Sequence, residues 1–123
     1  MRNISFALTK PQIVAQTKDV TRRLGWLHLK VGQLVQPVEK CMGLKPGESV
    51  VKIGGPILVV GVRREPLRMM TDDLDYGRDE CRREGFPELA PHEFIEMFCR
   101  ANKACAPETI ITRIEFGYWG DQR

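Results

Sequence analysis

The sequence predicts an α+β domain, a small, curved, mostly antiparallel β-barrel with two to three short helices. The run Ile57-Leu58-Val59-Val60 is apolar and β-branched enough for a central strand. Apolar and charged side chains alternate over 110–118, which is typical of a strand with one solvent-facing side. Between these strands lie two helical segments, at 72–84 and after Pro91. Five or six strands are expected in all, with contacts between the first and last closing the barrel.

The N-terminal part of the chain contains signals for a strand, a short helix and a second strand. Residues 4–8 alternate apolar and small side chains, which indicates the first strand. Thr9 is a favourable N-cap, and Pro11 suits the first turn of the short helix that follows. After a glycine-punctuated loop, 33–40 is expected to be a strand that Pro37 restricts to a sheet edge or a bulge.

The middle of the chain predicts two further strands, 49–53 and 56–64, separated by a Gly-Gly-Pro turn. Gly61 is expected to mark a β-bulge or a close backbone approach. In the final strand, 110–118, the side that carries Arg113 is expected to face solvent.

Two helices are expected between these strands. Thr71 can cap the first, which has acidic residues in its first turn, arginines in its last and Gly85 as a stop signal. Pro91 opens the second, whose apolar stripe is interpreted as core: Phe94, Ile95, Phe98 and Cys99.

Composition indicates one domain over 1–123, with 42% apolar and 28% charged residues and no sign of disorder. The longest apolar runs are too short to span a bilayer, so no membrane partner is expected. Because the N-terminus lacks a secretory pattern, the cytoplasm is the expected location. The net charge of +3 permits nucleic-acid binding without requiring it.

The cysteines and histidines predict neither a metal site nor a cofactor. No Cys-x-x-Cys pair occurs, and the two histidines, His28 and His92, are interpreted as bystanders. In a reducing compartment the four cysteines are expected to be mostly buried thiols: Cys41, Cys81, Cys99 and Cys105.

The segment around Lys18 concentrates reactive and cationic groups just before a predicted turn. Lys18 and Thr21 can converge if the backbone curls, so that a desolvated amine could take the hydroxyl proton. Arg22 and Arg23 offer planar forks for phosphate or carboxylate. The alternative interpretation is a solvated basic loop.

An ordered set of motifs covers nearly the whole chain. It comprises Lys18-x-x-Thr21-x-Arg23, the 29–34 segment Leu-Lys-Val-Gly-Gln-Leu, and Val62-Arg63-x-Glu65-Pro66-Leu67, then Glu84-Gly85-Phe86-Pro87, Pro91-His92-Glu93-Phe94 and the closing 112–116 segment. In this order the motifs resemble the ASCH domain, a member of the PUA-like β-barrel superfamily.

The resemblance implies RNA or nucleotide-level binding. A subset of small bacterial ASCH proteins are amidohydrolases that remove the acetyl group from 4-acetylcytidine. By resemblance, Thr21 would attack the amide carbonyl, Lys18 would activate it, and Glu84 would act as general acid or base for the leaving amine. Arg23 would steady the substrate or the developing oxyanion.

Two alternatives share the same cleft. A non-catalytic RNA-binding module would use Arg22, Arg23 and Arg63 for phosphate contacts and Trp26 for base stacking, although Trp26 could equally cap the core. A ribonuclease is the third hypothesis, weakened by the absence of a well-placed histidine pair. An amine, a hydroxyl and a carboxylate within reach in a closed pocket would favour an enzyme. An open basic groove with an exposed Trp26 would favour binding alone.

Overall fold

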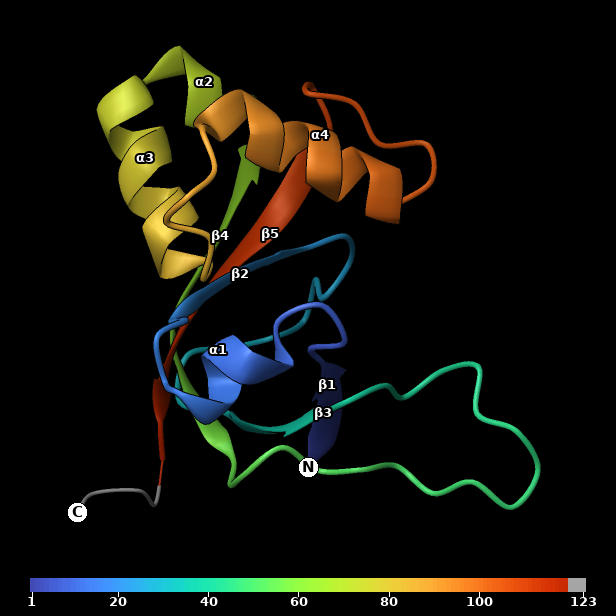
Figure 1. Ribbon diagram of the computed structural model, residues 1–123. Coiled ribbons are helices and arrows are strands. Elements are labelled where there is room, and N and C mark those ends of the chain that lie inside the picture. Colours follow the sequence, from blue (N-terminus) through green and yellow to red (C-terminus); the bar gives the residue numbers. More distant parts are fainter. Residues whose placement is uncertain (120–123) are drawn as a thin grey trace.

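The computed structural model describes residues 1–119, which form a five-stranded mixed sheet and four helices (Figure 1). The sheet order is β1-β3-β4-β5-β2. The strands are β1 (Arg2–Ser5), β2 (Val20–Arg23), β3 (Leu34–Val38), β4 (Ile57–Pro66) and β5 (Ile110–Tyr118). The helices are α1 (Lys10–Val14), α2 (Met69–Asp72), α3 (Leu74–Arg83) and α4 (Pro91–Ala101).

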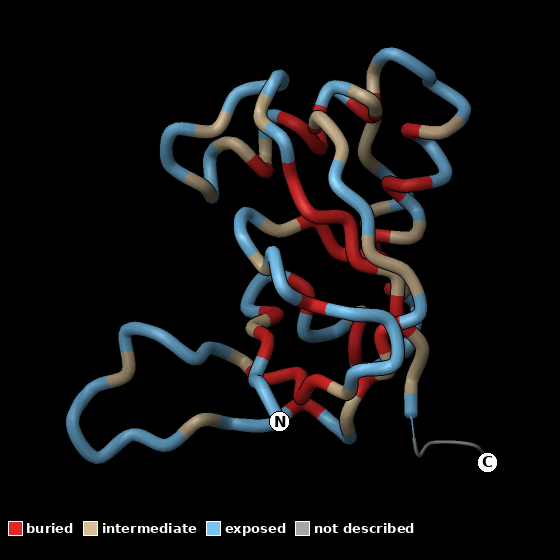
Figure 2. The backbone as a smooth tube through the Cα atoms, turned by 180° about the vertical axis from the view of Figure 1, so that it is seen from behind, coloured by how far each residue is buried: buried red, intermediate tan, exposed pale blue. Residues whose placement is uncertain are grey.

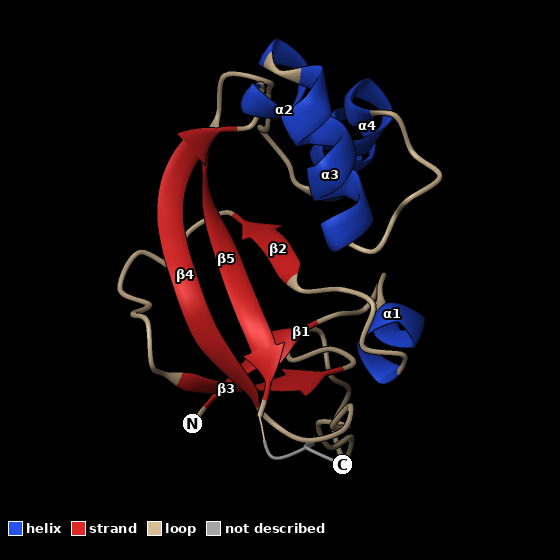
Figure 3. Cartoon of the chain, turned by 90° about the vertical axis from the view of Figure 1, so that its left-hand side faces the viewer, coloured by secondary structure: helices blue, strands red, loops and turns tan. Residues whose placement is uncertain are grey.

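The long strands β4 and β5 organise the sheet. They pair antiparallel from Ile57↔Tyr118 to Pro66↔Ile110 and curve together along their length (Figure 3). β5 also pairs antiparallel with β2, and β4 with β3, whereas β1 runs parallel to β3. The predicted α+β class with a mostly antiparallel sheet is therefore confirmed.

Over residues 1–119 the sheet does not close into a barrel. β1 and β2 are its two edges, so the expected pairing of the first and last strands is not formed. The physical reason is that β4 and β2 already occupy both hydrogen-bonding edges of β5, which leaves no edge for β1.

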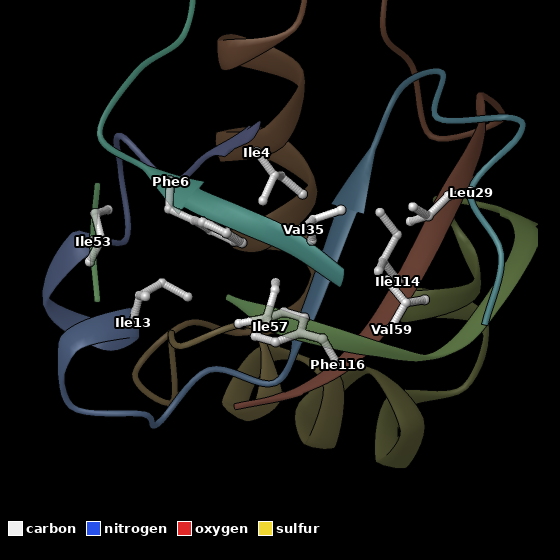
Figure 4. Packing of buried hydrophobic residues seen from close by; sticks show 10 residues of the cluster. All are labelled: Ile4, Phe6, Ile13, Leu29, Val35, Ile53, Ile57, Val59, Ile114 and Phe116. Atoms are coloured by element: carbon white, nitrogen blue, oxygen red, sulfur yellow. The ribbon is translucent and has the colours of Figure 1, made fainter. Parts of the chain in front are cut away.

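Two hydrophobic clusters stabilise the two ends of the molecule. The first lies against β1, β3, β4 and β5 and includes the side chain of Ile13 from α1 (Figure 4). The second is formed largely by α2, α3 and α4, with Leu67 and Ile111 from the chain next to β4 and from β5. Buried residues follow the strands and inner helix faces, while the long segment between β3 and β4 is mostly exposed (Figure 2).

Several strand predictions are confirmed, one is wrong and one strand was missed, and the first strand, expected at 4–8, spans Arg2–Ser5. The bulge expected at Gly61 is present as a register shift between Val59 and Gly61. The strand expected at 49–53 is reduced to a single bridge between Val38 and Lys52. β2 was not predicted, because Thr21 and Arg22 are polar yet buried there.

Pro37 lies in a strand with a neighbour on each side, not at the sheet edge that its missing N–H predicts. The pairing of β3 with β4 covers only Leu34 and Val35, so it stops before the proline. The Pro37 carbonyl still accepts a 2.9 Å hydrogen bond from Ile53 N. The proline therefore occupies a position where no donor is required.

The helix predicted at 72–84 is present as α3, but its N-cap is Asp73 and not the predicted Thr71, which lies inside the short preceding helix α2. Asp73, in an extended conformation, breaks the helix, and its carboxylate accepts a hydrogen bond of 3.2 Å from Tyr76 N as the N-cap of α3. The stop at Gly85 is confirmed, since this residue has a φ of +97°. The α4 prediction is also confirmed, with Pro91 in its first turn. Among the helices of residues 1–119, none is long and apolar enough to cross a membrane.

The Gly77→Ala variant is expected to lose about 1–3 kcal/mol or more of unfolding free energy, because a Cβ at this position overlaps the backbone of α2. That Cβ would lie 1.9 Å from the Met70 carbonyl oxygen. Urea denaturation monitored by circular dichroism measures the loss. Gly117→Ala is the matched control, since a Cβ there meets no atom within 4 Å. Equal stability of the two variants would contradict the close packing of α2 on α3.

Candidate functional site

A cavity of about 320 Å³ opens between the end of β1, strand β2, the end of α3 and helix α4. One part of its wall is polar and comes from β2, the segment that leads into it and the end of α3: Lys18, Thr21, Arg22, Arg23 and Glu84. The facing part is apolar and largely aromatic: Phe6, Phe86, Phe94, Met97 and Phe98. The cavity can therefore receive a ligand with an apolar, flat portion and a polar group directed at β2.

The polar wall is assembled because the end of α3 is joined to the chain entering β2. Asp19 N donates to the Arg83 carbonyl at 2.9 Å, and the Arg83 guanidinium binds the Asp19 carboxylate with two hydrogen bonds of 3.1 Å. Lys18 directly precedes Asp19, before β2 begins, and Glu84 directly follows Arg83 as the C-cap of α3. Lys18 and Glu84, which are 66 positions apart in sequence, therefore meet where the end of α3 is hydrogen-bonded to the chain entering β2.

Lys18 and Glu84 form a buried ion pair, with 2% and 3% of their surfaces exposed. Lys18 Nζ donates to Glu84 Oε1 at 2.8 Å and to the Glu84 carbonyl oxygen at 2.7 Å. Burial lowers the pKa of Lys18 below its usual range, and this effect outweighs the attraction of Glu84, which acts to raise it. Arg23 and Arg22 lower the same pKa further by charge repulsion. A lysine in this setting gives up its proton more readily than one in water.

Thr21 is buried beside this pair and is held by Arg23. Arg23 Nε donates to Thr21 Oγ1 at 3.0 Å, and Arg23 Nη2 donates to the Ser5 carbonyl at 2.6 Å. In the described part of the chain, no hydrogen bond joins Lys18 Nζ to Thr21 Oγ1. The three residues that the resemblance assigns to catalysis therefore share one cavity, with the amine directed at Glu84.

Arg23 is the cation of the cavity that lacks an acidic partner. Within residues 1–119 no carboxylate forms an ion pair with it, and its guanidinium lies 4.8 Å from the centre of the Phe6 ring. Burial lowers the pKa of Arg23 to about 10, which still leaves the group charged at neutral pH. An anionic group on a ligand would be attracted to this position.

Arg22 is directed away from the cavity opening into a buried network. Its side chain exposes none of its surface, and its Nη1 donates to Glu84 Oε2 at 3.2 Å. Its Nη2 binds three further groups, Glu65, Tyr76 and Glu80, with a distance of 2.7 Å to Glu80. Although it reaches the cavity wall, Arg22 holds Glu84 in place and has no free terminal nitrogen for the phosphate contact predicted for it.

Glu80 and Arg113 complete this network, and neither was predicted as part of the site. Arg113 donates to Glu80 through Nε at 2.5 Å and Nη2 at 3.0 Å, and both residues are buried. The expectation that this side of 110–118 faces solvent is wrong at Arg113, because Glu80 supplies a buried counter-ion. The spacing of Glu80 and Glu84, one helical turn apart, is the sequence signal that could have indicated a shared acidic face.

Two other predicted RNA contacts lie outside the cavity lining. Trp26 is half-buried and packs against the first hydrophobic cluster, with the Arg2 guanidinium 3.9 Å above its ring. Arg63 is largely exposed and donates to Glu65 at 2.8 Å and to the Tyr76 hydroxyl at 2.7 Å. The structure therefore brings together Lys18, Thr21, Arg22, Arg23 and Glu84, and leaves these two residues apart.

The described residues contain no group of three or more histidine, cysteine or acidic side chains arranged to hold a metal ion. In comparisons with known proteins, the chain matches no family model, no curated protein and no solved structure. The function is therefore argued from the geometry of the cavity.

Proposed function

We propose that this chain is an ASCH-domain protein that binds RNA or a modified nucleoside in the cavity, and that it hydrolyses the amide of 4-acetylcytidine. The observation that carries the proposal is the buried Lys18–Glu84 pair, joined at 2.8 Å beside the Thr21 hydroxyl in one cavity. A nucleophile, a basic amine and a carboxylate are the groups that amide hydrolysis needs.

The surroundings of these groups favour catalysis over simple surface binding. Lys18 and Glu84 are buried, and the facing wall is aromatic, so water is restricted near the reacting groups. Trp26 is half-buried and does not line the cavity, so it supplies no stacking surface inside it.

In the proposed reaction the proton shared by Lys18 and Glu84 moves first. When it resides on Glu84, the neutral Lys18 amine can accept the Thr21 hydroxyl proton as Thr21 Oγ1 attacks the acetyl carbonyl. Arg23, which donates to Thr21 Oγ1 at 3.0 Å, is placed to stabilise the developing oxyanion. Glu84 then gives its proton to the leaving amine of cytidine. Water hydrolyses the acetyl ester on Thr21 and releases acetate.

The proposal includes membership of the PUA-like superfamily, with a sheet that stays open between β1 and β2 over residues 1–119, and a cytoplasmic location. The two edge strands approach each other where Arg23 Nη2 in β2 donates to the Ser5 carbonyl of β1 at 2.6 Å, so a side chain links the edges that a barrel would join. The four cysteines are free thiols, which fits a reducing compartment.

Incubation of the pure protein with 4-acetylcytidine tests the proposal, with cytidine release followed by chromatography. Wild-type protein is expected to release cytidine, while Lys18→Met and Thr21→Val are expected to lose at least about 100-fold in rate. Circular dichroism shows whether each variant is folded. A folded wild-type protein that releases no cytidine would exclude 4-acetylcytidine as its substrate.

Binding without turnover is the second candidate, and Arg23 is the observation that favours it, because its charge lacks an acidic partner. We expect Arg23→Gln to weaken binding of cytidine monophosphate by roughly 10-fold, the cost of one charge-assisted contact, and to weaken binding of cytidine much less. Isothermal titration calorimetry measures this difference. Arg78→Gln removes the same charge from an exposed position on α3 and is the matched control. An equal loss for nucleoside and nucleotide would contradict a phosphate contact at Arg23.

A further inference from the structure

Cys99 and Cys105 lie close together at the end of α4, with their Sγ atoms 3.0 Å apart. Both are half-buried and pack against the second hydrophobic cluster. The other two thiols differ from this pair, since Cys41 is exposed and Cys81 is buried. The four thiols all lie in the described residues, and only Cys99 and Cys105 contact each other.

The backbone after α4 keeps the two sulfurs together. Asn102 ends the helix in an extended conformation, and its side-chain amide donates to the Phe98 carbonyl at 2.9 Å. Ala104 has a φ of +59°, which turns the chain back toward the helix and brings Cys105 onto Cys99.

The loop beyond Cys105 is anchored on the chain entering α2. Pro107 O accepts a hydrogen bond of 2.7 Å from Arg68 N, and Thr109 O accepts one of 2.9 Å from Leu67 N. Cys105 is therefore held between the end of α4 and a fixed segment of the loop, so the approach of the two sulfurs is built into the fold.

We propose that Cys99 and Cys105 form a reversible dithiol–disulfide site that is oxidised by small-molecule disulfides. This inference is independent of the proposed function. The Cys105 thiolate attacks one sulfur of the oxidant, which forms a mixed disulfide and releases one thiolate. Cys99 then loses its proton and attacks Cys105 Sγ, which forms the internal disulfide and releases the second thiolate. The protein dithiol is oxidised, and the oxidant is reduced to two thiols.

The order of attack follows from the environment of the two sulfurs. Burial raises the pKa of the Cys99 thiol to about 11, and the hydrogen bond to Cys105 acts in the same direction. Cys99 is therefore protonated at neutral pH, which suits it to the second, intramolecular step. In that step the sulfur under attack already lies beside Cys99, and this proximity compensates for the small fraction of Cys99 that is thiolate.

Oxidation at this place would act on the cavity. Phe98, on the last turns of α4, and Asn102, the C-cap of that helix, both line the cavity and lie on either side of Cys99 in sequence. A bond between Cys99 and Cys105 would tie this end of the helix to the following loop and restrict fraying of the last turn. The amides at 98–102 are therefore expected to exchange more slowly with solvent in the oxidised protein.

Oxidised glutathione is the probe for the test, on the full chain with Cys41→Ser to remove the exposed thiol. Mass spectrometry is expected to show loss of two hydrogen atoms and a peptide that links Cys99 to Cys105. The Cys99→Ser variant should instead retain one glutathione on Cys105, because the second step is blocked. The Cys105→Ser variant should react with glutathione at least about 10-fold more slowly, because the Cys99 thiol, whose pKa is raised, must attack.

Two results would overturn the inference, and a third would overturn the effect of oxidation on the cavity. In the first, Cys99 and Cys105 stay reduced in the presence of oxidised glutathione, although Cys41 in the unsubstituted chain reacts with it under the same conditions. The second is separate glutathione adducts on both residues without an internal disulfide. Thirdly, unchanged hydrogen exchange at 98–102 after complete oxidation would remove the coupling to the cavity, with α1 as the internal reference.

Discussion

Replacing Glu80 by alanine is expected to lower the free energy of unfolding by about 3–5 kcal/mol, the range found when one partner of a buried ion pair is removed. Glu80 is 1% exposed, and its carboxylate binds both Arg113 and Arg22. Without it, two buried guanidinium groups lose their shared acceptor. Urea denaturation measures the loss. Glu80→Gln, which keeps the size of the side chain, separates the charge from the packing contribution.

Asp79→Ala is the matched control for the Glu80 variants. Asp79 is the preceding residue of α3, and it pairs with Arg82 at 2.6 Å on the exposed side of the helix. Exposed pairs of this kind contribute about 0–1 kcal/mol, so the control should remain near wild-type stability. Comparable losses in Asp79→Ala and Glu80→Ala would contradict the stabilising role that we assign to the buried network.

The Glu80 carboxylate also makes stability depend on pH. Burial alone would raise its pKa, but Arg113 and Arg22 outweigh burial and hold the pKa at about 2. Because the folded pKa lies below the unfolded value, this contribution is complete above about pH 4.5 and is lost as the pH falls toward 2. Wild-type protein should therefore lose stability over this window more steeply than Glu80→Gln. Parallel curves for the two proteins would show that another group controls acid unfolding.

The network explains which elements could be predicted from sequence and which could not. β4 was predicted from its apolar, β-branched run and β5 from the alternation of its apolar and charged residues, and both signals are purely local. β2 was missed because Arg22 is fully buried there, and arginine is rarely buried unless it is paired. Its partners Glu80 and Glu84 lie about sixty residues away in sequence, so no local pattern shows that the charge is neutralised.

The same distinction applies to the candidate site. Lys18, Thr21 and Glu84 were named through a resemblance of ordered motifs, and the structure places all three around one cavity. The local expectation that Lys18 and Thr21 meet through a turn is wrong, since Val20 begins a strand and Lys18 binds Glu84 instead. The role of Arg113 could not be derived from the alternation in β5. Alternation shows which side chains share a face of the strand, but not whether a charged residue from another part of the chain covers that face.

The Glu84→Gln variant is expected to lower the rate of amide hydrolysis by about 10²–10⁴-fold, because it removes the proton carrier beside Lys18. It should also lower the pKa of Lys18 further. Glu84 is the group that acts to raise this pKa against burial, and glutamine carries no charge to do so. The carbon resonance next to Nζ in a lysine-labelled sample reports the Lys18 titration directly by NMR.

Arg23→Gln supplies the opposite change for the same measurement. Arg23 lowers the pKa of Lys18 by repulsion between like charges, so its removal should raise that pKa. The Lys18–Glu84 hydrogen bond does not involve Arg23, so the variant alters the charge near the amine while leaving its partner in place. Shifts of opposite sign in Glu84→Gln and Arg23→Gln would establish that the charges of the cavity wall control the amine. A Lys18 pKa that responds to neither substitution would mean that burial alone sets it, and would leave Glu84 without the proton-carrying role on which the proposed hydrolysis depends.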